Sequence, residues 1–373
     1  MPERIMLFIH SMDGGGSERQ MSYLANELVG HSTVCLVTLS PVGLDAYPID
    51  SGVERIGLEM TARNVGGIIR GVHANWKRIQ AIRRHVLAWK PNLLISFCDT
   101  NNILALLAVA KDIPVIISER SDPRRQKLSG LWETMRRIAY PRSAACAVQT
   151  QEVGDYVVES KLVPRDRIAI IPSAVKIPPI DIASIERNRA ESAPKKLIFV
   201  GRLSREKNVD SLLSAWSKLP HHHDDWRLVI VGDGAERTGL QELARKFGIE
   251  ASIRWEHWCS DVWGKLSSAH AFCLVSRYEG FPQSVLEAMA CGLAVAVTDC
   301  SPAIRETISD EHNGLIISAH GNPSEIASTL DRLLSDEKLR SKLGLNARHR
   351  AMDFEWACVA PKWLELCQKV VGS

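Results

Sequence analysis

The stretch that decides the fold is RYEGFPQSVLEAMACG, residues 277–292. The apolar run before it, 271–275, and the apolar run after it, 293–297, have the length and composition of buried strands. Between them, residues 284–291 are apolar and rich in helix formers. A strand, a turn, a helix and a second strand in this order predict a parallel sheet covered by helices.

Two glutamates of this stretch fall where such a fold binds ligands. Glu279 lies in the turn that leaves the first strand, and Glu287 lies inside the helix that follows. Open α/β sheets bind ligands outside the carboxyl ends of their strands, and a carboxylate beside free helix N–H groups suits a ligand with hydroxyl and phosphate groups. The alternative is structural: Ser284 and Glu287 have capping-box spacing, although Pro282 favours an earlier helix start.

Three motifs follow one another in the second half of the chain. They read FVGRLSREKN at 199–208, VIVGDG at 229–234, and EGFP with LEAMACG and AVAVTD within 279–299. Their order and spacing resemble the signature of the retaining, nucleotide-sugar-dependent glycosyltransferases of family four. The resemblance covers most of 195–315 and implies an α/β architecture, the GT-B fold, in which two doubly wound Rossmann-like domains face each other across a cleft.

The resemblance also implies roles for single residues. Glu279 would contact the donor sugar and Glu287 the ribose hydroxyls, while the backbone N–H groups of Gly280 and Phe281 would face the sugar or the diphosphate. Trp258, in a turn where relatives usually carry glycine, is a candidate contact for the base, with a packed aromatic residue as the alternative.

Two cations, Arg202 and Lys207, match the family motif in the turn after the strand 197–200. Fixed cations stabilise the negative charge of a leaving nucleoside diphosphate without a metal, Arg as a bidentate fork and Lys as a point charge. A solvated charge cluster is the alternative, since Arg205 and Glu206 lie alongside. No Asp-x-Asp motif lies in a suitable turn, so neither a metal nor another cofactor is expected, and we interpret His221–His223 as a surface loop.

The first half of the chain repeats the alternation of strands and helices. Gly14, Gly15 and Gly16 fit the family's glycine turn, although three glycines alone also suit a flexible loop. Ser17 and Gln20 predict a capping box for the helix that follows. The spacing Gly-x-Gly-x-x-Gly is absent, which disfavours a dinucleotide-dependent oxidoreductase. Strands are expected at 5–10, 34–39, 93–97, 115–118 and 144–149.

The segment ISERSDP, residues 117–123, departs from the family pattern. Many relatives place a histidine where Glu119 stands. The string resembles a bacterial subgroup that extends lipid-linked oligosaccharides, such as N-acetylgalactosamine transferases. Glu119 orients the acceptor hydroxyl in one interpretation and pairs with Arg120 or Arg124 in the other, and both stay open.

Length and composition agree with a two-domain soluble protein. The chain has 373 residues, 45% hydrophobic and 24% charged, and its net charge of +3 implies no nucleic-acid partner. Prolines near 171–179 and a polar segment to Ala193 predict the connection between an acceptor-binding domain, 1–175, and a nucleotide-sugar-binding domain, 176–354. The resemblance implies that a helix at about 355–373 crosses back to the first domain.

Several features predict a cytoplasmic enzyme bound peripherally to the inner face of the cytoplasmic membrane. Nine scattered cysteines fit a reducing compartment, the N-terminus lacks a signal-peptide layout, and no apolar run is long enough to span a bilayer. In the helix expected at 68–90, Arg70, Lys77 and Arg84 recur every seven residues and form a cationic stripe. Such a stripe suits an anionic membrane surface or a lipid-linked diphosphate, with an ordinary solvated face as the alternative.

The resemblance therefore implies a retaining glycosyltransferase that moves a sugar from a UDP-sugar, such as UDP-GalNAc, to a polyprenyl-diphosphate-linked glycan in bacterial glycan, O-antigen or exopolysaccharide assembly. The alternatives are the same chemistry on a soluble acceptor, or a non-catalytic protein that binds a nucleotide sugar.

Overall fold

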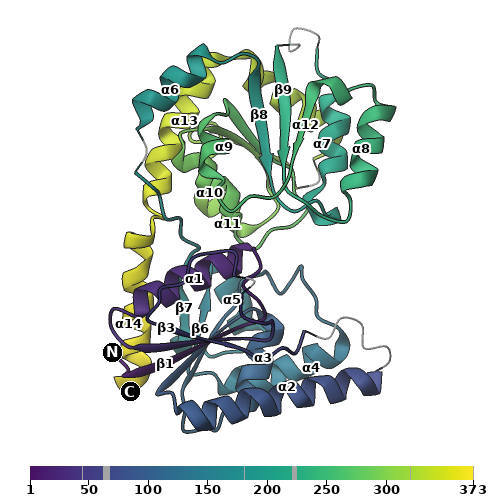
Figure 1. Ribbon diagram of the computed structural model, residues 1–373. Helices are drawn as coiled ribbons and strands as arrows, with labels where there is room; N and C mark the ends of the chain where they lie inside the picture. The colour runs from purple at the N-terminus through teal and green to yellow at the C-terminus, as the bar shows by residue number, and fades with distance from the viewer. Residues whose placement is uncertain (44, 62–67, 180, 221–224, 320, 373) are drawn as a thin grey trace. The chain divides into compact units, whose positions relative to one another are not determined.

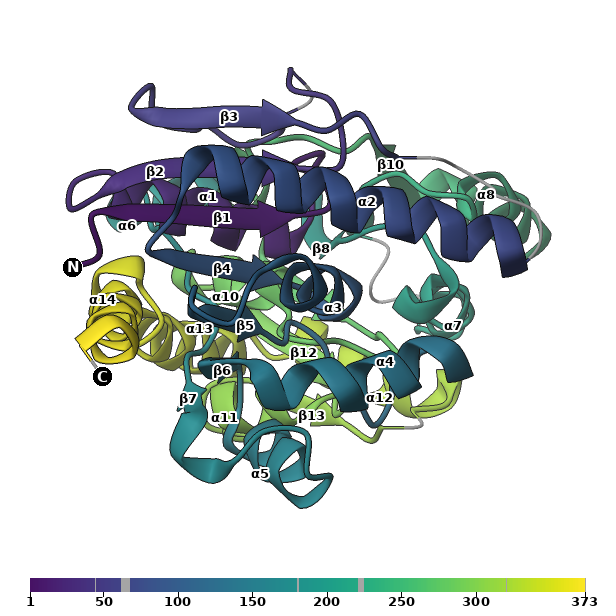
Figure 2. The ribbon, with the colours of Figure 1, turned by 90° about the horizontal axis from the view of Figure 1, so that it is seen from below.

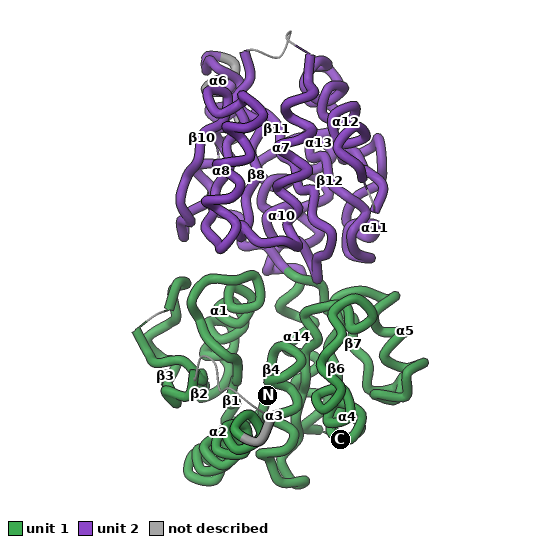
Figure 3. The backbone as a smooth tube through the Cα atoms, turned by 90° about the vertical axis from the view of Figure 1, so that its right-hand side faces the viewer, with its two compact units in different colours: residues 1–173, 359–373 green, residues 174–358 purple. Residues whose placement is uncertain are grey.

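The computed structural model describes residues 1–43, 45–61, 68–179, 181–220, 225–319 and 321–372. The chain divides into two compact units (Figure 3). Unit 1 comprises Met1–Ser173 and Val359–Ser373, and unit 2 comprises Ala174–Cys358. These boundaries lie within four residues of those expected from the sequence.

Unit 1 is built on a parallel seven-stranded sheet with the order β3-β2-β1-β4-β5-β6-β7 (Figure 1). All five expected strands are present, and β3 and β7 were not expected. Both lie at the edges of the sheet and are only partly buried. The sequence of β3, VERIG, contains two charged residues, and β7, IAI, has only three residues. The strands are β1 Arg4–Ile9, β2 Thr33–Thr38, β3 Val53–Gly57, β4 Leu93–Phe97, β5 Val115–Ser118, β6 Ala145–Val148 and β7 Ile168–Ile170.

Helices cover both faces of this sheet, as its buried central strands require. Three of them, α2, α3 and α4, lie side by side on one face, and α1 covers the opposite face (Figure 2). The expected capping box of α1 is wrong, because the helix begins one residue earlier and its N-cap, Gly15, has no side chain to bond. The helices of the unit are α1 Gly16–Leu28, α2 Ile68–Trp89, α3 Asp99–Ala108, α4 Gly130–Ala139, α5 Gln151–Glu159 and most of α14 Trp356–Gly372.

Unit 2 has a parallel six-stranded sheet with the order β10-β9-β8-β11-β12-β13. Its strands are β8 Lys195–Val200, β9 Trp226–Val231, β10 Ile253–Glu256, β11 Ala271–Leu274, β12 Ala294–Thr298 and β13 Leu315–Ile317. Its helices are α6 Ile182–Glu191, α7 Val209–Trp216, α8 Arg237–Lys246, α9 Trp263–Ser267, α10 Gln283–Ala290, α11 Pro302–Thr307, α12 Pro323–Ser335 and α13 Glu337–Met352.

The polar segment before Ala193 is not all connection, because it contains α6 as part of unit 2. The guanidinium of Arg189 on this helix donates hydrogen bonds to the carbonyls of Leu266, Ser267 and Cys291. One long-range anchor of this kind holds a helix that shows little apolar periodicity in its sequence.

Candidate functional site

In unit 2 the strand order reverses between β8 and β11, and the loops after these two strands carry most of the expected donor site. Such a reversal is where open α/β sheets bind ligands. Lys207 follows β8 and Glu279 follows β11, and the structure brings them together, with Nζ 2.5 Å from Oε1. The same carboxylate oxygen accepts a hydrogen bond from the Ser276 hydroxyl at 2.6 Å. Both side chains are mostly buried and their charges compensate each other.

Arg202 lies in the same turn and is exposed; none of the residues that the structure describes forms an ion pair with it. Two glycines of the loop after β9 fix this turn by close approach. A Cβ on Gly232 would lie 2.0 Å from the Gly201 carbonyl oxygen, and one on Gly234 would lie 2.1 Å from that of Leu203. The guanidinium therefore stands on a rigid turn with its donors open to a ligand.

The helix α10 begins next to this pair. Its N-cap is Pro282, which makes no side-chain capping bond, so the capping-box interpretation of Ser284 and Glu287 is wrong. Glu287 is 2% exposed and lies on the buried face of the helix. Just before the helix, the backbone N–H groups of Gly280 and Phe281 have no acceptor within the described parts of the chain. This N-terminus thus offers donors to an anionic or hydroxyl-rich ligand.

Trp258 is 46% exposed, so its interpretation as a packed aromatic residue is wrong. Its backbone N–H donates to Asp233 Oδ2 at 2.8 Å, and His257 Nδ1 lies 2.8 Å from Asp233 Oδ1. The bond from Trp258 is the main cause that lowers the pKa of Asp233. Asp233 fixes the Trp258 turn, a role that was not predicted from the sequence although Asp233 belongs to the VIVGDG motif.

In unit 1 the strand order reverses between β1 and β4, and the loops after these strands meet as well. Gly15 is the N-cap of α1, and a Cβ there would lie 2.3 Å from a carboxylate oxygen at the end of the flexible Glu18 side chain, which would have to move. Cys98 follows β4 with φ 74° and ψ 148°, a backbone conformation that is strained for a residue with a side chain. Its thiol is hydrogen-bonded to Ser17, and burial raises the pKa of Cys98 to about 12.

Gly16 and Ser17 begin α1 in this turn. In the described structure no acceptor takes the backbone N–H groups of Gly15, Gly16 and Ser17. The expected glycine turn thus leads into a helix N-terminus with open donors.

Glu119 follows β5 and is buried, with 1% of its surface exposed. Its Oε1 accepts hydrogen bonds from the Tyr140 hydroxyl at 2.6 Å and from Asn102 Nδ2 at 3.2 Å. Burial raises the pKa of Glu119 to about 7, against the opposing charge of Arg136. The carboxyl group is thus desolvated and close to its titration point at neutral pH.

The expected alternative, in which Glu119 pairs with Arg120 or Arg124, is wrong. Arg124 forms ion pairs with Asp122 and Glu152, and Arg120 donates to the Ser173 hydroxyl at 2.7 Å. The charge that faces Glu119 is that of Arg136, which comes from α4.

A buried polar cluster surrounds Glu119, and its other members were not predicted from the sequence. Arg136 is fully buried, with Nη2 3.7 Å from Asp99 Oδ2. Nothing in the local sequence of α4 distinguishes Arg136 from the exposed Arg137 beside it. Several buried polar atoms of the cluster have no hydrogen-bond partner in the structure: Ser96 Oγ, Asp99 Oδ2, Asn102 Oδ1, Ser118 Oγ, Glu119 Oε2, and Nε and Nη2 of Arg136.

The three cations expected on α2, Arg70, Lys77 and Arg84, are exposed and have no ion pair with any described acid. The apolar side chains of this helix are only partly buried. Ile82 and Val86 pack in the core, whereas large hydrophobic side chains of the same helix are exposed: Val72, Trp76 and Leu87. Apolar and cationic side chains therefore share the outer surface of α2.

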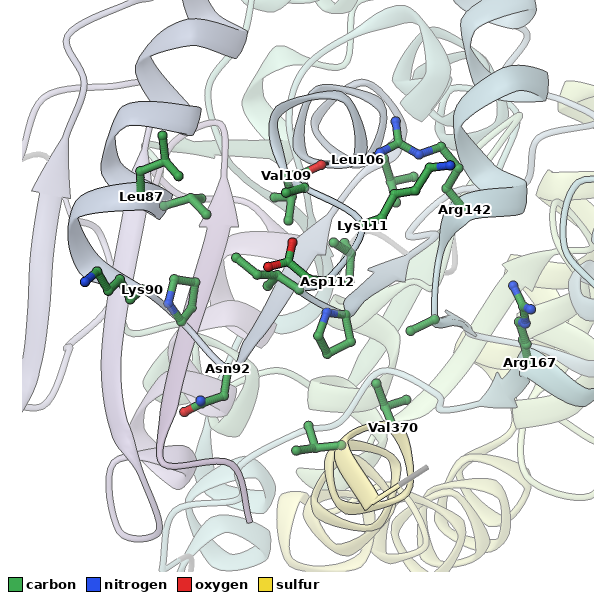
Figure 4. Close-up of a pocket in the computed structure, with 18 of the residues that line it drawn as sticks. Leu87, Lys90, Asn92, Leu106, Val109, Lys111, Asp112, Arg142, Arg167 and Val370 are labelled. Carbon is green, nitrogen blue, oxygen red and sulfur yellow. Dashed lines mark hydrogen bonds between the residues drawn. The ribbon is translucent and has the colours of Figure 1, made fainter.

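A hollow of about 1020 Å³ in unit 1 lies at the amino ends of β4, β5 and β6 (Figure 4). Glu119 follows the carboxyl end of β5, at the opposite edge of the sheet. The arginines of the hollow bond to the chain itself: Arg142 donates to the Val109 carbonyl, and Arg167 to those of Pro141 and Ser143. These cations stabilise turns and helix ends, and the hollow contains none of the expected site residues.

Within the described ranges, no group of three or more His, Cys, Asp or Glu side chains is placed to hold a metal ion. The helices that the structure describes include none that is long and apolar enough to cross a membrane. His221–His223 lie outside the described residues.

Comparisons with known proteins cover both units. Residues 15–174 match the glycosyl transferase 4-like domain, and residues 182–350 match the glycosyl transferases of group 1. The chain is 27% identical over 372 residues, 99% of either chain, to a protein of Campylobacter jejuni subsp. jejuni serotype O:2. That protein is named GalNAc-alpha-(1->4)-GalNAc-alpha-(1->3)-diNAcBac-PP-undecaprenol alpha-1,4-N-acetyl-D-galactosaminyltransferase.

Two solved structures share the fold at low sequence identity. Sucrose-phosphate synthase from Thermosynechococcus elongatus has a TM-score of 0.84 at 17% identity, with 99% of both chains covered. Anabaena Alr3699/HepE, solved in complex with UDP-glucose, has a TM-score of 0.74 at 16% identity, with 98% of this chain and 99% of that one covered. Together with the two domain matches, these likenesses show the GT-B fold that the sequence predicts.

Proposed function

Because the chain belongs to the glycosyltransferases that join a 4-like domain to a group 1 domain, we propose that it is a retaining enzyme that transfers a sugar from a UDP-sugar to a polyprenyl-diphosphate-linked glycan. The single observation that carries the donor half of this proposal is the ion pair between Lys207 and Glu279 at the strand reversal of unit 2. A cation for the diphosphate and a carboxylate for the sugar hydroxyls stand there within one hydrogen bond of each other.

The reaction breaks the bond between the anomeric carbon of the sugar and the diphosphate oxygen. Negative charge then grows on the leaving nucleoside diphosphate, and Lys207 and Arg202 neutralise it. Arg202 is open to a bidentate contact, and the N–H groups of Gly280 and Phe281 add neutral donors. Glu279 binds sugar hydroxyls and keeps Lys207 in place, and Glu287 binds the ribose. With these cations in place, the transfer needs no metal ion.

The acceptor half of the proposal is supported by the Campylobacter protein, whose name specifies an undecaprenol-PP-linked acceptor and whose whole length aligns with this chain. It is also supported by the outer surface of α2, on which Arg70, Lys77, Arg84 and Trp76 are all exposed. Cations attract anionic lipid or a lipid diphosphate, and an indole ring suits the membrane interface. The enzyme would then act from the cytoplasm, bound peripherally to the inner face of the membrane.

We test the proposal with a transferase assay. It combines a panel of UDP-sugars with polyprenyl-diphosphate-linked glycans and with matched soluble glycans. Mass spectrometry identifies the product, and NMR of its anomeric proton reports retention or inversion. We expect UDP-GalNAc or a related UDP-sugar to be transferred to the lipid-linked acceptor with retention, equally well in the presence of a chelator. Transfer only to soluble glycans, inversion, or a divalent-metal requirement would contradict the corresponding part of the proposal. Binding of a UDP-sugar without transfer to any acceptor would indicate a non-catalytic protein.

A further inference from the structure

Arg120 is a buried cation without a counter-ion. The residue is 9% exposed, and its Nη2 donates to the Ser173 hydroxyl at 2.7 Å. The Gln149 amide oxygen lies 3.2 Å from the same nitrogen in the orientation that satisfies this network. The guanidinium carbon lies 5.1 Å from the centre of the Phe97 ring, and Nε has no hydrogen-bond partner. All these partners are neutral, and no carboxylate among the described residues forms an ion pair with Arg120.

Among the described residues, two other arginines are as buried, Arg136 and Arg340, and their partners are carboxylates in one case and the partly negative carbonyls of a helix C-terminus in the other. Arg136 lies within 4 Å of the carboxylates of Asp99 and Glu133. Arg340, 8% exposed and thus as buried as Arg120, donates to the carbonyls of Leu333 and Leu334 at the end of α12. Burial lowers the pKa of Arg120 to about 10, which reflects the cost of keeping this charge out of water. A buried charge that lacks a partner destabilises a fold, so its retention calls for a reason other than stability.

The location of Arg120 supplies that reason. It follows β5 by two residues, at the carboxyl edge of the sheet, and its guanidinium carbon lies 5.1 Å from the ring of Phe97, the residue before Cys98. The Cys98 N–H donates to the carbonyl of Ser118 at the end of β5, and the Cys98 thiol is hydrogen-bonded to Ser17 in the first turn of α1. This thirteen-residue helix directs the open N–H groups of Gly15 and Gly16 and the positive end of its dipole to the same edge. A fixed cation and a helix N-terminus therefore converge around Cys98.

We propose that Arg120 binds phosphate oxygens of a diphosphate at this edge of unit 1, together with the N-terminus of α1. The diphosphate supplies the negative charge that no described residue provides for Arg120. Its phosphate oxygens accept hydrogen bonds from the N–H groups of the guanidinium. The inference rests on the proposed function, because that reaction brings two diphosphates to the enzyme: the one of the nucleotide and the one that links the acceptor glycan to its lipid.

The test compares wild type with Arg120→Met, Arg120→Lys and the control Arg340→Met, in the full-length protein. Isothermal titration measures the Kd for UDP and for a short-chain polyprenyl diphosphate, and differential scanning calorimetry measures Tm. For Arg120→Met we expect the Kd to rise by about ten- to a hundredfold for whichever of the two ligands contacts Arg120, because one charge-assisted hydrogen bond is lost. Its Tm should stay constant or rise, since an unpaired buried charge is removed. Arg120→Lys should recover part of the affinity.

Arg340→Met should do the reverse: a lower Tm, because two carbonyls lose their donor, and an unchanged Kd for both ligands. A loss confined to UDP assigns Arg120 to the donor, and a loss confined to the polyprenyl diphosphate assigns it to the acceptor. If Arg120→Met lowers Tm and leaves both affinities intact, Arg120 is a structural clamp and the inference is wrong. If the wild-type protein binds neither ligand, the proposed function fails as well. If the wild-type protein binds a ligand and Arg120→Met binds it equally well, only the inference about Arg120 is wrong.

Discussion

The carboxyl edges of the two sheets handle charge in opposite ways. In unit 2, Lys207 and Glu279 neutralise each other across the strand reversal, partly open to solvent. In unit 1, Glu119 and Arg120 are desolvated and their hydrogen-bond partners are neutral: Tyr140 and Asn102 for the acid, Ser173 for the base. The charge of Arg136 offsets the burial of Glu119 only in part, since the pKa of Glu119 stays raised. A compensated pair costs little to keep and can exchange one partner for a ligand, whereas a buried charge that is not fully compensated carries a desolvation cost that a ligand or a proton relieves.

The largest effect should come from opening the pair in unit 2. Lys207→Ala removes the charge that faces the leaving diphosphate, so kcat should fall by about a hundred- to a thousandfold, the usual loss of one electrostatic stabiliser. Arg202→Ala should have an effect of the same order. Arg205→Ala, in the same loop and also exposed, is the matched control and should retain turnover. Initial rates at saturating donor measure the effect; near-normal kcat in Lys207→Ala would show that the pair is structural.

The next largest effect should be on membrane binding, and it should come from the exposed cations of unit 1, which face solvent and are free to contact anionic lipid. Replacing Arg70, Lys77 and Arg84 together by Gln should weaken partition onto anionic liposomes by up to about a hundredfold, at about 1 kcal/mol per charge near the surface. The KM for a lipid-diphosphate acceptor should rise while donor affinity stays constant. A control triple on unit 2, Arg245, Lys246 and Lys338 to Gln, removes the same charge from other exposed positions. Equal partition of both triples would refute a membrane role for α2.

Titration of Glu119 should have a somewhat smaller effect, which is on the free energy of unfolding. Its folded-state pKa of about 7 lies above the ordinary value of 4.5, so the folded protein holds a proton that the unfolded chain releases between these two pH values. Stability should therefore decrease by about 2 to 3 kcal/mol as pH rises from 4.5 to 7, and should change no further from this cause above 7. Glu119→Gln should remove this slope, and the exposed Glu159→Gln should keep it. Urea unfolding midpoints across this range would contradict the desolvated state of Glu119 if the two variants had the same slope.

The smallest effect distinguishes the two glutamates of unit 2. Glu279→Gln should reduce kcat by about tenfold with a small change in UDP affinity, because its ligand is the sugar. Glu287→Gln should weaken UDP binding by about tenfold, the value of one hydrogen bond to a charged group. Titration calorimetry and initial rates measure both. A lower Tm with intact UDP affinity in Glu287→Gln would assign the buried carboxylate to packing of α10 instead of ligand binding.

The same contrast explains how far the sequence could be interpreted. In unit 2, Lys207 and Glu279 each lie in a turn after a recognisable strand, so local motifs predicted their place at the sheet edge. In unit 1, Arg136 and Tyr140 reach Glu119 through the packing of α4 and the turn after it, which no local pattern records. The open alternatives for Glu119 reflected this, and the structure replaced the expected arginine partners with a tyrosine and an asparagine.

Sequence patterns also gave wrong predictions where a residue forms a hydrogen bond to a residue distant in sequence. Ser17 has capping-box spacing, but its hydroxyl bonds to Cys98, a contact between residues 81 positions apart in sequence. Trp258 is a large aromatic residue of the kind expected to pack in a core. The hydrogen bond from its backbone N–H to Asp233 instead fixes a turn in which the ring is exposed. The edge strand β3 was missed because a strand paired on one side needs little apolar surface, and β7 was missed because its three residues are too few to recognise as a strand.

The last helix, α14, joins the two units in chain order, since Trp356 belongs to unit 2 and the residues from Val359 onward belong to unit 1. Its Trp363 stacks on Phe97 with ring centres 5.5 Å apart, and Phe97 is the ring over which Arg120 lies. During synthesis, the ribosome makes Met1–Ser173 of unit 1 before unit 2, and the residues from Val359 onward after unit 2. Unit 1 therefore acquires its final packing only after all of unit 2 has been translated, and a nascent chain that stops short of α14 would present an unfinished surface to proteases and chaperones.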